Sequence, residues 1–155
     1  MASRNFHRES ASAPSARILL VDDNGDGLCA RKSVLEEIGY QIVTATSGLD
    51  ALAKFAASRC DLVVTDYKMP RMDGLELIAK IRAARPEFPI ILISGFADTL
   101  GLDEKSTGAD AVIQKSSNEV SHLMRAVNRL LRKKTAPRKP PGAERPDVRA
   151  KRNGV

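Results

Sequence analysis

Residues 62–81 read LVVTDYKMPRMDGLELIAKI, and this stretch decides the fold of the chain. Its first four residues form an apolar or β-branched run with the length of a buried strand. From Leu75 to Ile81 the apolar residues recur three and four positions apart, as in a helix that covers a sheet. A strand, a short loop and a helix in this order predict a βα unit, which is the building block of parallel sheets.

The same unit recurs along the chain. Four further short runs have strand length, and a segment with helical spacing follows each of them. Three of the five runs are apolar without alternation, as in strands that helices cover on both faces. We therefore predict an α/β domain with a doubly wound (βα)5 fold, in which a five-stranded parallel sheet has helices on both faces. The predicted strands are 18–21, 41–45, 62–65, 90–93 and 111–113.

Glycine and proline predict where the helices end. The helix after the first strand should stop at Gly39, and the third should end before Pro86. The fourth, within residues 97–107, has the weakest pattern because Gly101 interrupts it, so we expect a short or mobile helix. The last helix has a single apolar stripe, formed by Val120, Leu123, Met124, Val127 and Leu131.

The composition is consistent with one domain and two unstructured ends. The chain has 155 residues, of which 43% are apolar, and a formal net charge of +6. We expect residues 1–16 to be a disordered N-terminal segment, 17–132 the folded domain, and 133–155 a disordered tail rich in basic residues and proline. Residues 132–155 contain nine basic and two acidic residues, so the folded part is slightly acidic.

Several functional classes are disfavoured by composition. No apolar run approaches the roughly 18 residues needed to cross a membrane, and the first 16 residues lack the apolar centre of a secretory signal. We therefore expect a cytoplasmic protein. Cys29 and Cys60 form no CxxC motif, so they should be reduced, buried cysteines and not part of a zinc site or a disulfide framework. Six aromatic residues and no Trp disfavour a platform for single-stranded nucleic acid.

The basic tail is expected to be a solvated extension. Its functional alternative is a weak, salt-sensitive attraction to nucleic acid, to an acidic partner or to a membrane surface. The charge of the chain therefore describes the tail, while the chemistry has to be sought in the slightly acidic domain.

Polar residues follow four of the predicted strands. Because the carboxyl ends of parallel strands meet at one edge of a sheet, we expect these side chains to share one small cleft. Each of them alone has an ordinary explanation as a helix cap, a turn former or a surface charge. The prediction therefore depends on all five occurring together: Asp22, Asp23, Asp66, Ser94 and Lys115.

Three carboxylates in one cleft repel one another unless some are protonated or a hard cation lies among them. Oxygen ligands suit Mg²⁺ better than zinc, and Mg²⁺ commonly joins carboxylates to a phosphoryl group. A lysine and a hydroxyl opposite could neutralise phosphoryl oxygens and donate hydrogen bonds to them. Asp66 ends the central strand, and as a carboxylate ionised at pH 7 it is the best candidate for a nucleophile that forms an acyl phosphate.

Four segments carry a resemblance to a known family. ILLVDDN (18–24), VVTDYKMPRMDGLEL (63–77), ILISG (91–95) and GADAVIQK (108–115) resemble the receiver domain of two-component response regulators, the family of the bacterial chemotaxis regulator. The resemblance covers about residues 16–132 and implies a flavodoxin-like fold. It also implies a Mg²⁺ cofactor and, as the partner, a histidine kinase or a histidine phosphotransfer protein.

The resemblance implies a role for each matched residue. Asp66 would accept the phosphoryl group from the kinase, the phosphotransfer protein or a small phosphodonor. Asp23 would bind Mg²⁺ directly and Asp22 through water, with Asp66 and the backbone carbonyl of Lys68 completing the metal site. The remaining catalytic groups would be the Ser94 hydroxyl, which moves to the phosphoryl group, and Lys115, which forms a salt bridge with it.

Two positions depart from the family pattern. Val112 stands where the family usually has Tyr or Phe, and Ser116 replaces a proline that is usually cis. A cis bond before a residue other than proline costs about 2.5–4 kcal/mol, so the loop after Lys115 should differ from that of the family. Lys68 and Phe96 occupy the positions that control access of water, and we expect them to make the phosphate on Asp66 long-lived.

These expectations describe a stand-alone receiver that signals by docking on a downstream protein or by relaying phosphoryl groups. It would not be an enzyme in the ordinary sense. The alternative is a pseudo-receiver, a protein-binding module that acts without phosphorylation. A nucleotide or flavin binder of the same fold ranks below both, because carboxylates and not a glycine-rich phosphate loop follow the first strand.

Overall fold

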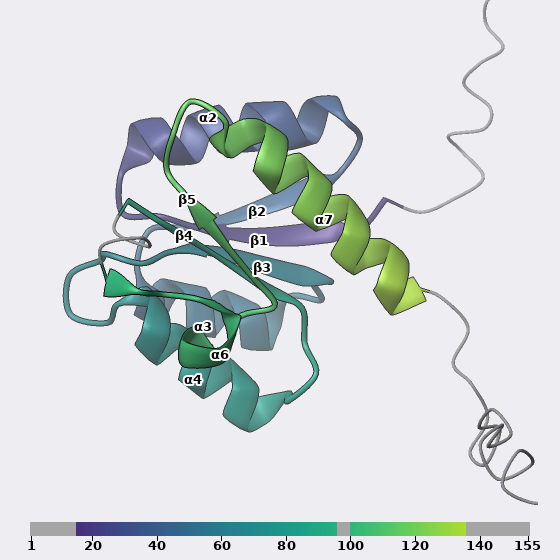
Figure 1. Ribbon diagram of the computed structural model, residues 1–155. Coiled ribbons are helices and arrows are strands. Elements are labelled where there is room, and N and C mark those ends of the chain that lie inside the picture. The colour runs from purple at the N-terminus through teal and green to yellow at the C-terminus, as the bar shows by residue number, and fades with distance from the viewer. Residues whose placement is uncertain (1–14, 96–99, 136–155) are drawn as a thin grey trace, which may run out of the picture.

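The computed structural model describes residues 15–95 and 100–135, in which five strands alternate with five helices. The strands form one parallel sheet in the order β2-β1-β3-β4-β5, so β3 is central (Figure 1). The predicted doubly wound α/β fold is therefore confirmed. The strands are β1 (Arg17–Val21), β2 (Gln41–Ala45), β3 (Leu62–Asp66), β4 (Ile90–Ser94) and β5 (Ala111–Gln114).

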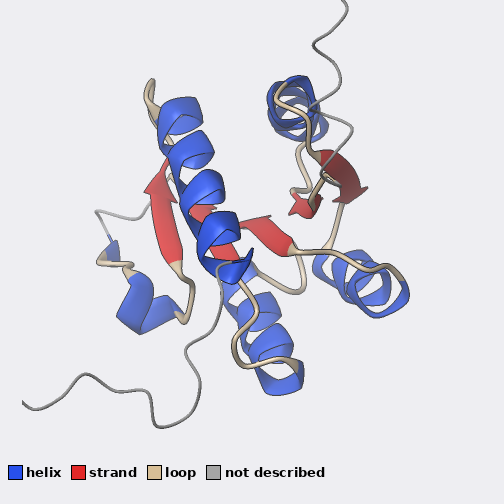
Figure 2. Ribbon diagram, turned by 90° about the vertical axis from the view of Figure 1, so that its right-hand side faces the viewer, coloured by secondary structure: helices blue, strands red, loops and turns tan. Residues whose placement is uncertain are grey.

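Helices cover both faces of the sheet, as Figures 1 and 2 show. One face carries α2 and α7, which contact each other, and the other carries α3 and α4, with α6 beside them. The bounds of the helices are α2 (Gly25–Glu37), α3 (Gly48–Ala57), α4 (Gly74–Ala84), α6 (Glu104–Thr107) and α7 (Glu119–Thr135).

Two apolar clusters explain why the strands are apolar without alternation. Leu20 and Val64 belong to a cluster with side chains of α2 and α7, whereas their neighbours Leu19 and Val63 belong to a cluster with side chains of α3 and α4. All four side chains are almost completely buried. Because both faces are covered, successive positions in the middle of these strands are apolar.

The helix ends agree with the sequence signals. Asp73 caps α4 by accepting the N–H of Glu76 at 3.0 Å, and the Glu76 carboxylate accepts the N–H of Asp73 at 3.2 Å. This capping box fixes the start of α4 at Gly74, eight residues after Asp66. The helix ends at Ala84, before Pro86, and α2 ends shortly before Gly39, whose φ is 113°.

The last two helices differ in length. Helix α6 has four residues, which confirms a short fourth helix, while residues 96–99 of the predicted segment lie outside the described residues. Helix α7 continues to Thr135, three residues past the predicted end of the domain. Lysine and arginine are good helix formers, and their charges interact favourably with the carbonyl end of a helix. Most of the predicted terminal segments lie outside the described residues, so these boundaries stay predictions.

One prediction about the cysteines is wrong. Cys60 is buried, but Cys29 is exposed, and both are free thiols. Helix α2 turns Leu28 and Leu35 towards the sheet, which leaves position 29 on the solvent side. Across the described residues, no helix combines the length and the apolar character required to cross a membrane.

Candidate functional site

Three carboxylates meet at the carboxyl edge of the sheet. Asp22 and Asp23 directly follow β1, and Asp66 is the last residue of the adjacent strand β3. One oxygen of each side chain lies within 4.8 Å of the others. Asp22 and Asp66 are buried and Asp23 is exposed, so the cluster opens to solvent on one side.

A lysine and a hydroxyl complete the set of five residues that end the strands. Lys115 follows β5, and its Nζ lies 2.8 Å from Asp66 Oδ1 in an ion pair. Its backbone N–H donates to the carbonyl of Ser94 at 2.9 Å, and Ser94 is buried at the end of β4. Lys68, two residues after Asp66, is exposed in the following loop.

The buried Asp66 Oδ1 has an incomplete environment. Apart from the ion pair with Lys115, no hydrogen bond with favourable geometry reaches this oxygen from the described part of the chain. Among the described residues this buried oxygen therefore contacts one ammonium, and its remaining capacity to accept hydrogen bonds or bind a cation is unused. Together with the grouped oxygens of Asp22 and Asp23, it fits a site that receives a hard cation and a further oxygen-rich group.

The electrostatics of Asp66 support the same conclusion. Burial raises the pKa of its carboxyl above the usual value; the ammonium of Lys115 opposes this rise, and the negative charge of Asp22 adds to it. The ionised form is therefore disfavoured by the environment that the protein alone provides. A cation bound among the three carboxylates would favour it.

The loop after Asp66 is held tightly against the strand end. The N–H of Gly74 donates to the carbonyl of Tyr67 at 2.8 Å. A Cβ at position 74 would collide with the Asp66 carbonyl and would lie 2.9 Å from Leu92 Cδ1, so only glycine fits without rearrangement. Within the loop, Arg71 has a φ of 69°, in the left-handed region that few residues other than glycine adopt.

Sequence reasoning missed one charged residue at the site. Arg31 of α2 is only 7% exposed, and its Nη1 lies 2.6 Å from Asp22 Oδ2. Its Nε lies 2.6 Å from the Oε2 of Glu119, the first residue of α7. The signal was present in the pattern, because position 31 falls between Leu28 and Leu35 on the buried face of α2.

The two departures from the family pattern lie near this edge. Val112 is half-buried and packs against the cluster on the side of α3 and α4. No cis peptide bond occurs among the described residues, so the bond between Lys115 and Ser116 is trans. Phe96, predicted to control access of water, lies outside the described residues.

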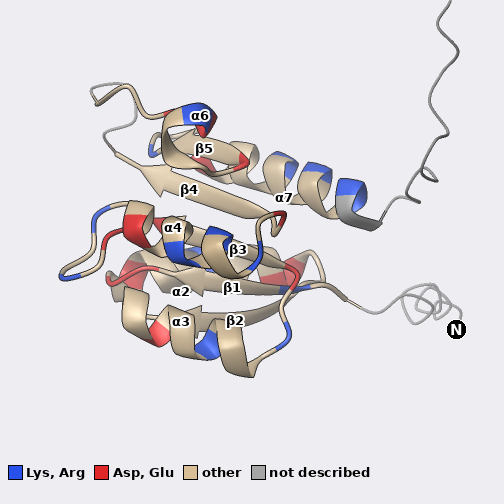
Figure 3. Cartoon of the chain, turned by 90° about the horizontal axis from the view of Figure 1, so that it is seen from below, with Lys and Arg blue, Asp and Glu red and all other residues tan. Residues whose placement is uncertain are grey.

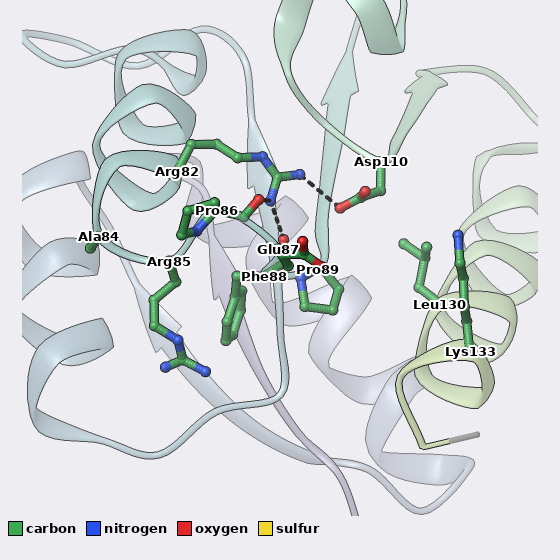
Figure 4. A pocket seen from close by; sticks show the side chains of 10 residues that line it. All are labelled: Arg82, Ala84, Arg85, Pro86, Glu87, Phe88, Pro89, Asp110, Leu130 and Lys133. Atoms are coloured by element: carbon green, nitrogen blue, oxygen red, sulfur yellow. Dashed lines mark hydrogen bonds and ion pairs between the residues drawn. The ribbon is translucent and has the colours of Figure 1, made fainter. Parts of the chain in front are cut away.

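A hollow of the described structure lies away from the acidic cluster. It has a volume of about 770 Å³ and lies near the start of β4 and the last turns of α4 and α7 (Figure 4). The amino ends of the strands lie on this side, opposite the edge that carries the acidic cluster. Arg82 crosses it to Asp110 with an Nη2–Oδ2 distance of 2.9 Å. Arg85 stacks over Phe88, with Cζ 4.9 Å from the ring centroid. Because both arginines are held by contacts within the chain, we assign the hollow a role in packing and not in ligand binding.

Basic side chains are not confined to the terminal tail. Exposed Lys and Arg follow one another along α7 (Figure 3). Residues 136–155 of the predicted tail lie outside the described residues, so its predicted contact with nucleic acid stays a prediction. The described basic side chains of α7 are Arg125, Arg129, Arg132 and Lys133.

A doubly wound parallel sheet with an acidic cluster and a lysine at its carboxyl edge defines the flavodoxin-like receiver fold. The family model described as "Response regulator receiver domain" matches residues 18–128. The chain therefore belongs to the response regulator receiver domain family, as the resemblance in the sequence implied.

Solved structures agree with this assignment. The response regulator TrrA from Thermotoga maritima, solved in complex with Mg²⁺ and BeF, is 37% identical with a TM-score of 0.68, and the match covers 74% of this chain and 98% of that one. A CheY-like receiver domain from Methanospirillum hungatei is 32% identical with a TM-score of 0.68, covering 78% of this chain and 99% of that one.

Curated relatives are longer proteins. The alkaline phosphatase synthesis transcriptional regulatory protein PhoP of Bacillus subtilis is 34% identical in an alignment of 119 residues that covers 73% of this chain and 48% of PhoP. The gliding motility regulatory protein of Myxococcus xanthus is 32% identical in an alignment of 136 residues that covers 82% of this chain and 17% of that protein. The chain thus spans at most about half the length of these relatives.

Proposed function

We propose that the protein accepts a phosphoryl group on Asp66 from a histidine kinase or a histidine phosphotransfer protein, in a Mg²⁺-dependent reaction. It then signals from the cytoplasm by docking on a downstream protein or by passing the phosphoryl group on. One observation carries this proposal: Asp66 lies within 4.8 Å of both other carboxylates, and Lys115 lies 2.8 Å from its Oδ1.

The reaction needs a nucleophile and a means of offsetting charge. A carboxylate oxygen of Asp66 forms a bond to phosphorus, while the bond from phosphorus to the donor's nitrogen or oxygen breaks and its electron pair leaves with the donor. Lys115 would then turn from the carboxylate to a phosphoryl oxygen, and the Ser94 hydroxyl would donate a hydrogen bond to another.

The donor set suits Mg²⁺. Asp22, Asp23, Asp66 and the backbone carbonyl of Lys68 would hold it, directly or through water, and they provide the oxygen ligands that this ion prefers. When bound, Mg²⁺ offsets negative charge on the carboxylates and on the incoming phosphoryl oxygens. The chain itself orients Asp66 through the strand end and the tight loop that Gly74 allows.

Intact mass after incubation with Mg²⁺ and acetyl phosphate tests the proposal. We expect wild-type protein to gain the mass of one phosphoryl group, whereas Asp66→Ala and wild type with a chelator should gain none. An adduct that persists in Asp66→Ala would place the acceptor elsewhere. No adduct on the wild type, with acetyl phosphate or with phosphoramidate, would favour the alternative of a phosphorylation-independent binding module.

Signalling through a partner protein belongs to the proposal too. The output would pass through the surface of the receiver domain to the protein on which it docks. Comparing the proteins captured by Asp66-phosphorylated and unphosphorylated protein tests this, since a phosphorylation-dependent partner should appear in one sample only.

A further inference from the structure

Arg31 connects two parts of the molecule that belong to different elements. From α2 it forms ion pairs with Asp22 beside the end of β1 and with Glu119 at the start of α7, each with a distance of 2.6 Å. The side chains of Arg31 and Asp22 are 7% and 2% exposed, and that of Glu119 is 16% exposed. Such buried, charge-assisted contacts are short and hold both partners in defined positions.

The pairing between Arg31 and Asp22 is built into the local structure. The other oxygen of Asp22, Oδ1, accepts the N–H of Asn24 at 2.9 Å, so the carboxylate is held from both sides. A Cβ at position 27 would lie 2.9 Å from Asp22 Oδ2 and 3.6 Å from Arg31 Nη1, so Gly27 leaves the space that the pair occupies. The backbone of Asn24 and the absence of a side chain at Gly27 thus fix the position of the buried ion pair between Arg31 and Asp22.

We propose that Arg31 is a positioning residue that links occupancy of the acidic site to the first turn of α7. The proposal rests on the function proposed above, in which Asp22 helps to hold Mg²⁺. Before the ion binds, the single positive charge of Arg31 is shared between Asp22 and Glu119. A cation bound among the carboxylates competes for the negative charge of Asp22, so the contact of Arg31 with Asp22 weakens and Glu119 becomes its main partner.

The link works in both directions. A change at the acidic site alters how firmly Arg31 holds Glu119, and therefore the start of α7. A partner that binds the first turn of α7 and displaces Glu119 would alter the affinity of the acidic site for the cation. By thermodynamic reciprocity, the cation alters the affinity for that partner by the same factor. This connection runs along the side of the sheet that carries α2 and α7 and does not involve Val112, which packs on the opposite face.

Mg²⁺ alone, titrated by calorimetry, tests the electrostatic half of the proposal. Arg31→Leu should bind Mg²⁺ about tenfold more tightly than the wild type, because a competing charge is gone. Lys32→Leu is the matched control: it removes the same charge one position along α2, from an exposed side chain paired with Glu36 at 3.1 Å. Its affinity should stay within about twofold of the wild type. Equal affinities of Arg31→Leu and wild type would overturn the proposal.

Hydrogen exchange in the first turn of α7 tests the link itself. In the wild type, Mg²⁺ with beryllofluoride should change the exchange of the amides in residues 120–123. Arg31→Lys keeps the charge but has no planar fork with which to contact both carboxylates, so it should bind Mg²⁺ like the wild type and lose this response. A response that survives unchanged in Arg31→Lys would overturn the link.

Glu119→Gln keeps the test decisive even where Arg31→Leu fails to fold. This variant leaves Arg31 with Asp22 alone, so we expect weaker Mg²⁺ binding and no response in α7; wild-type behaviour in both would contradict the proposal. The outcomes also separate the two proposals. A wild type that neither binds Mg²⁺ nor gains a phosphoryl group refutes the proposed function, whereas a phosphorylated wild type with unaltered variants refutes only the role of Arg31.

Discussion

Lys115 Nζ lies 2.8 Å from Asp66 Oδ1, although the two residues come from strands that are separated by β4. The lysine therefore reaches across the end of β4 to the central strand. Asp66 is 4% exposed, while the Lys115 side chain is 39% exposed. The ammonium thus lies at the mouth of the site, where it can meet an incoming phosphoryl group, and its loss should affect transfer more than folding.

Replacing this lysine should slow phosphorylation. For Lys115→Met we expect a rate of phosphoryl transfer from acetyl phosphate that is lower by about a hundredfold, which is the scale for losing one group that stabilises developing charge. Intact-mass time courses give the rate. Lys80→Met removes an exposed lysine of α4 and should react like the wild type. Equal rates in both variants would show that Lys115 has no part in the transfer.

The acidic site should destabilise the metal-free fold at neutral pH. Burial raises the pKa of Asp66 in the folded state, so the contribution of this carboxyl to stability is present below its unfolded pKa and is lost as pH rises through the folded value. Asp66→Asn should therefore raise the Tm at pH 7 in the presence of a chelator. The gain should shrink as the pH falls towards about 4.

Calorimetric melting across this pH range checks the prediction. Glu87→Gln, which removes an exposed carboxylate at the opposite edge of the sheet, serves as the control and should show little change. A gain for Asp66→Asn that is the same at every pH would argue against the buried charge as its source.

The sequence was sufficient to predict where the strands end and which side chains follow them. This succeeded for Asp66 and Lys115 because the topology of a parallel sheet brings carboxyl ends to one edge, whatever the detailed packing. The partners inside the site were not predictable in the same way. The contact of Arg31 with Glu119 joins residues 88 positions apart, and no local pattern specifies which carboxylate a buried arginine will meet.

Exposure was equally difficult to predict for single residues. Cys29 was expected inside because cysteine is usually buried, but the phase of α2 places it outside. Helix α7 runs through residues 133–135, where the predicted basic tail begins. A basic composition fits the last turn of a helix as well as it fits an unstructured segment.

The tight approach of α4 to the end of β3 predicts a strong effect at Gly74. For Gly74→Ala we expect a loss of about 1–3 kcal/mol in the free energy of unfolding, because the new methyl group collides with the Asp66 carbonyl. Urea denaturation measures the loss. Gly25→Ala is the control: a Cβ there meets no atom within 4 Å, so the variant should be as stable as the wild type or slightly more so.

Arg82 is expected to contribute to stability at the edge of the sheet opposite the acidic site. Its guanidinium donates to the carbonyls of Gly108, Pro86 and Phe88 and forms an ion pair with Asp110. These contacts tie the end of α4 to the turns before β4 and β5. Because most of these contacts are partly exposed, we expect Arg82→Met to lower the free energy of unfolding by about 1–2 kcal/mol.

The neighbouring arginine provides a matched comparison for Arg82. Arg85→Met removes the same charge but loses stacking contacts over Phe88 and, at 6.0 Å, over Phe55, each worth about 0.5–1 kcal/mol at an exposed site. The free energy of unfolding, measured by urea denaturation, should therefore be lowest for Arg82→Met, intermediate for Arg85→Met and highest for the wild type. If the two variants were equally stable, the carbonyl contacts of Arg82 would contribute nothing, and the turns before β4 and β5 would be held by the buried side chains alone. Phosphorylation of Asp66 should be unchanged in both variants, because the contacts lie at the other edge of the sheet.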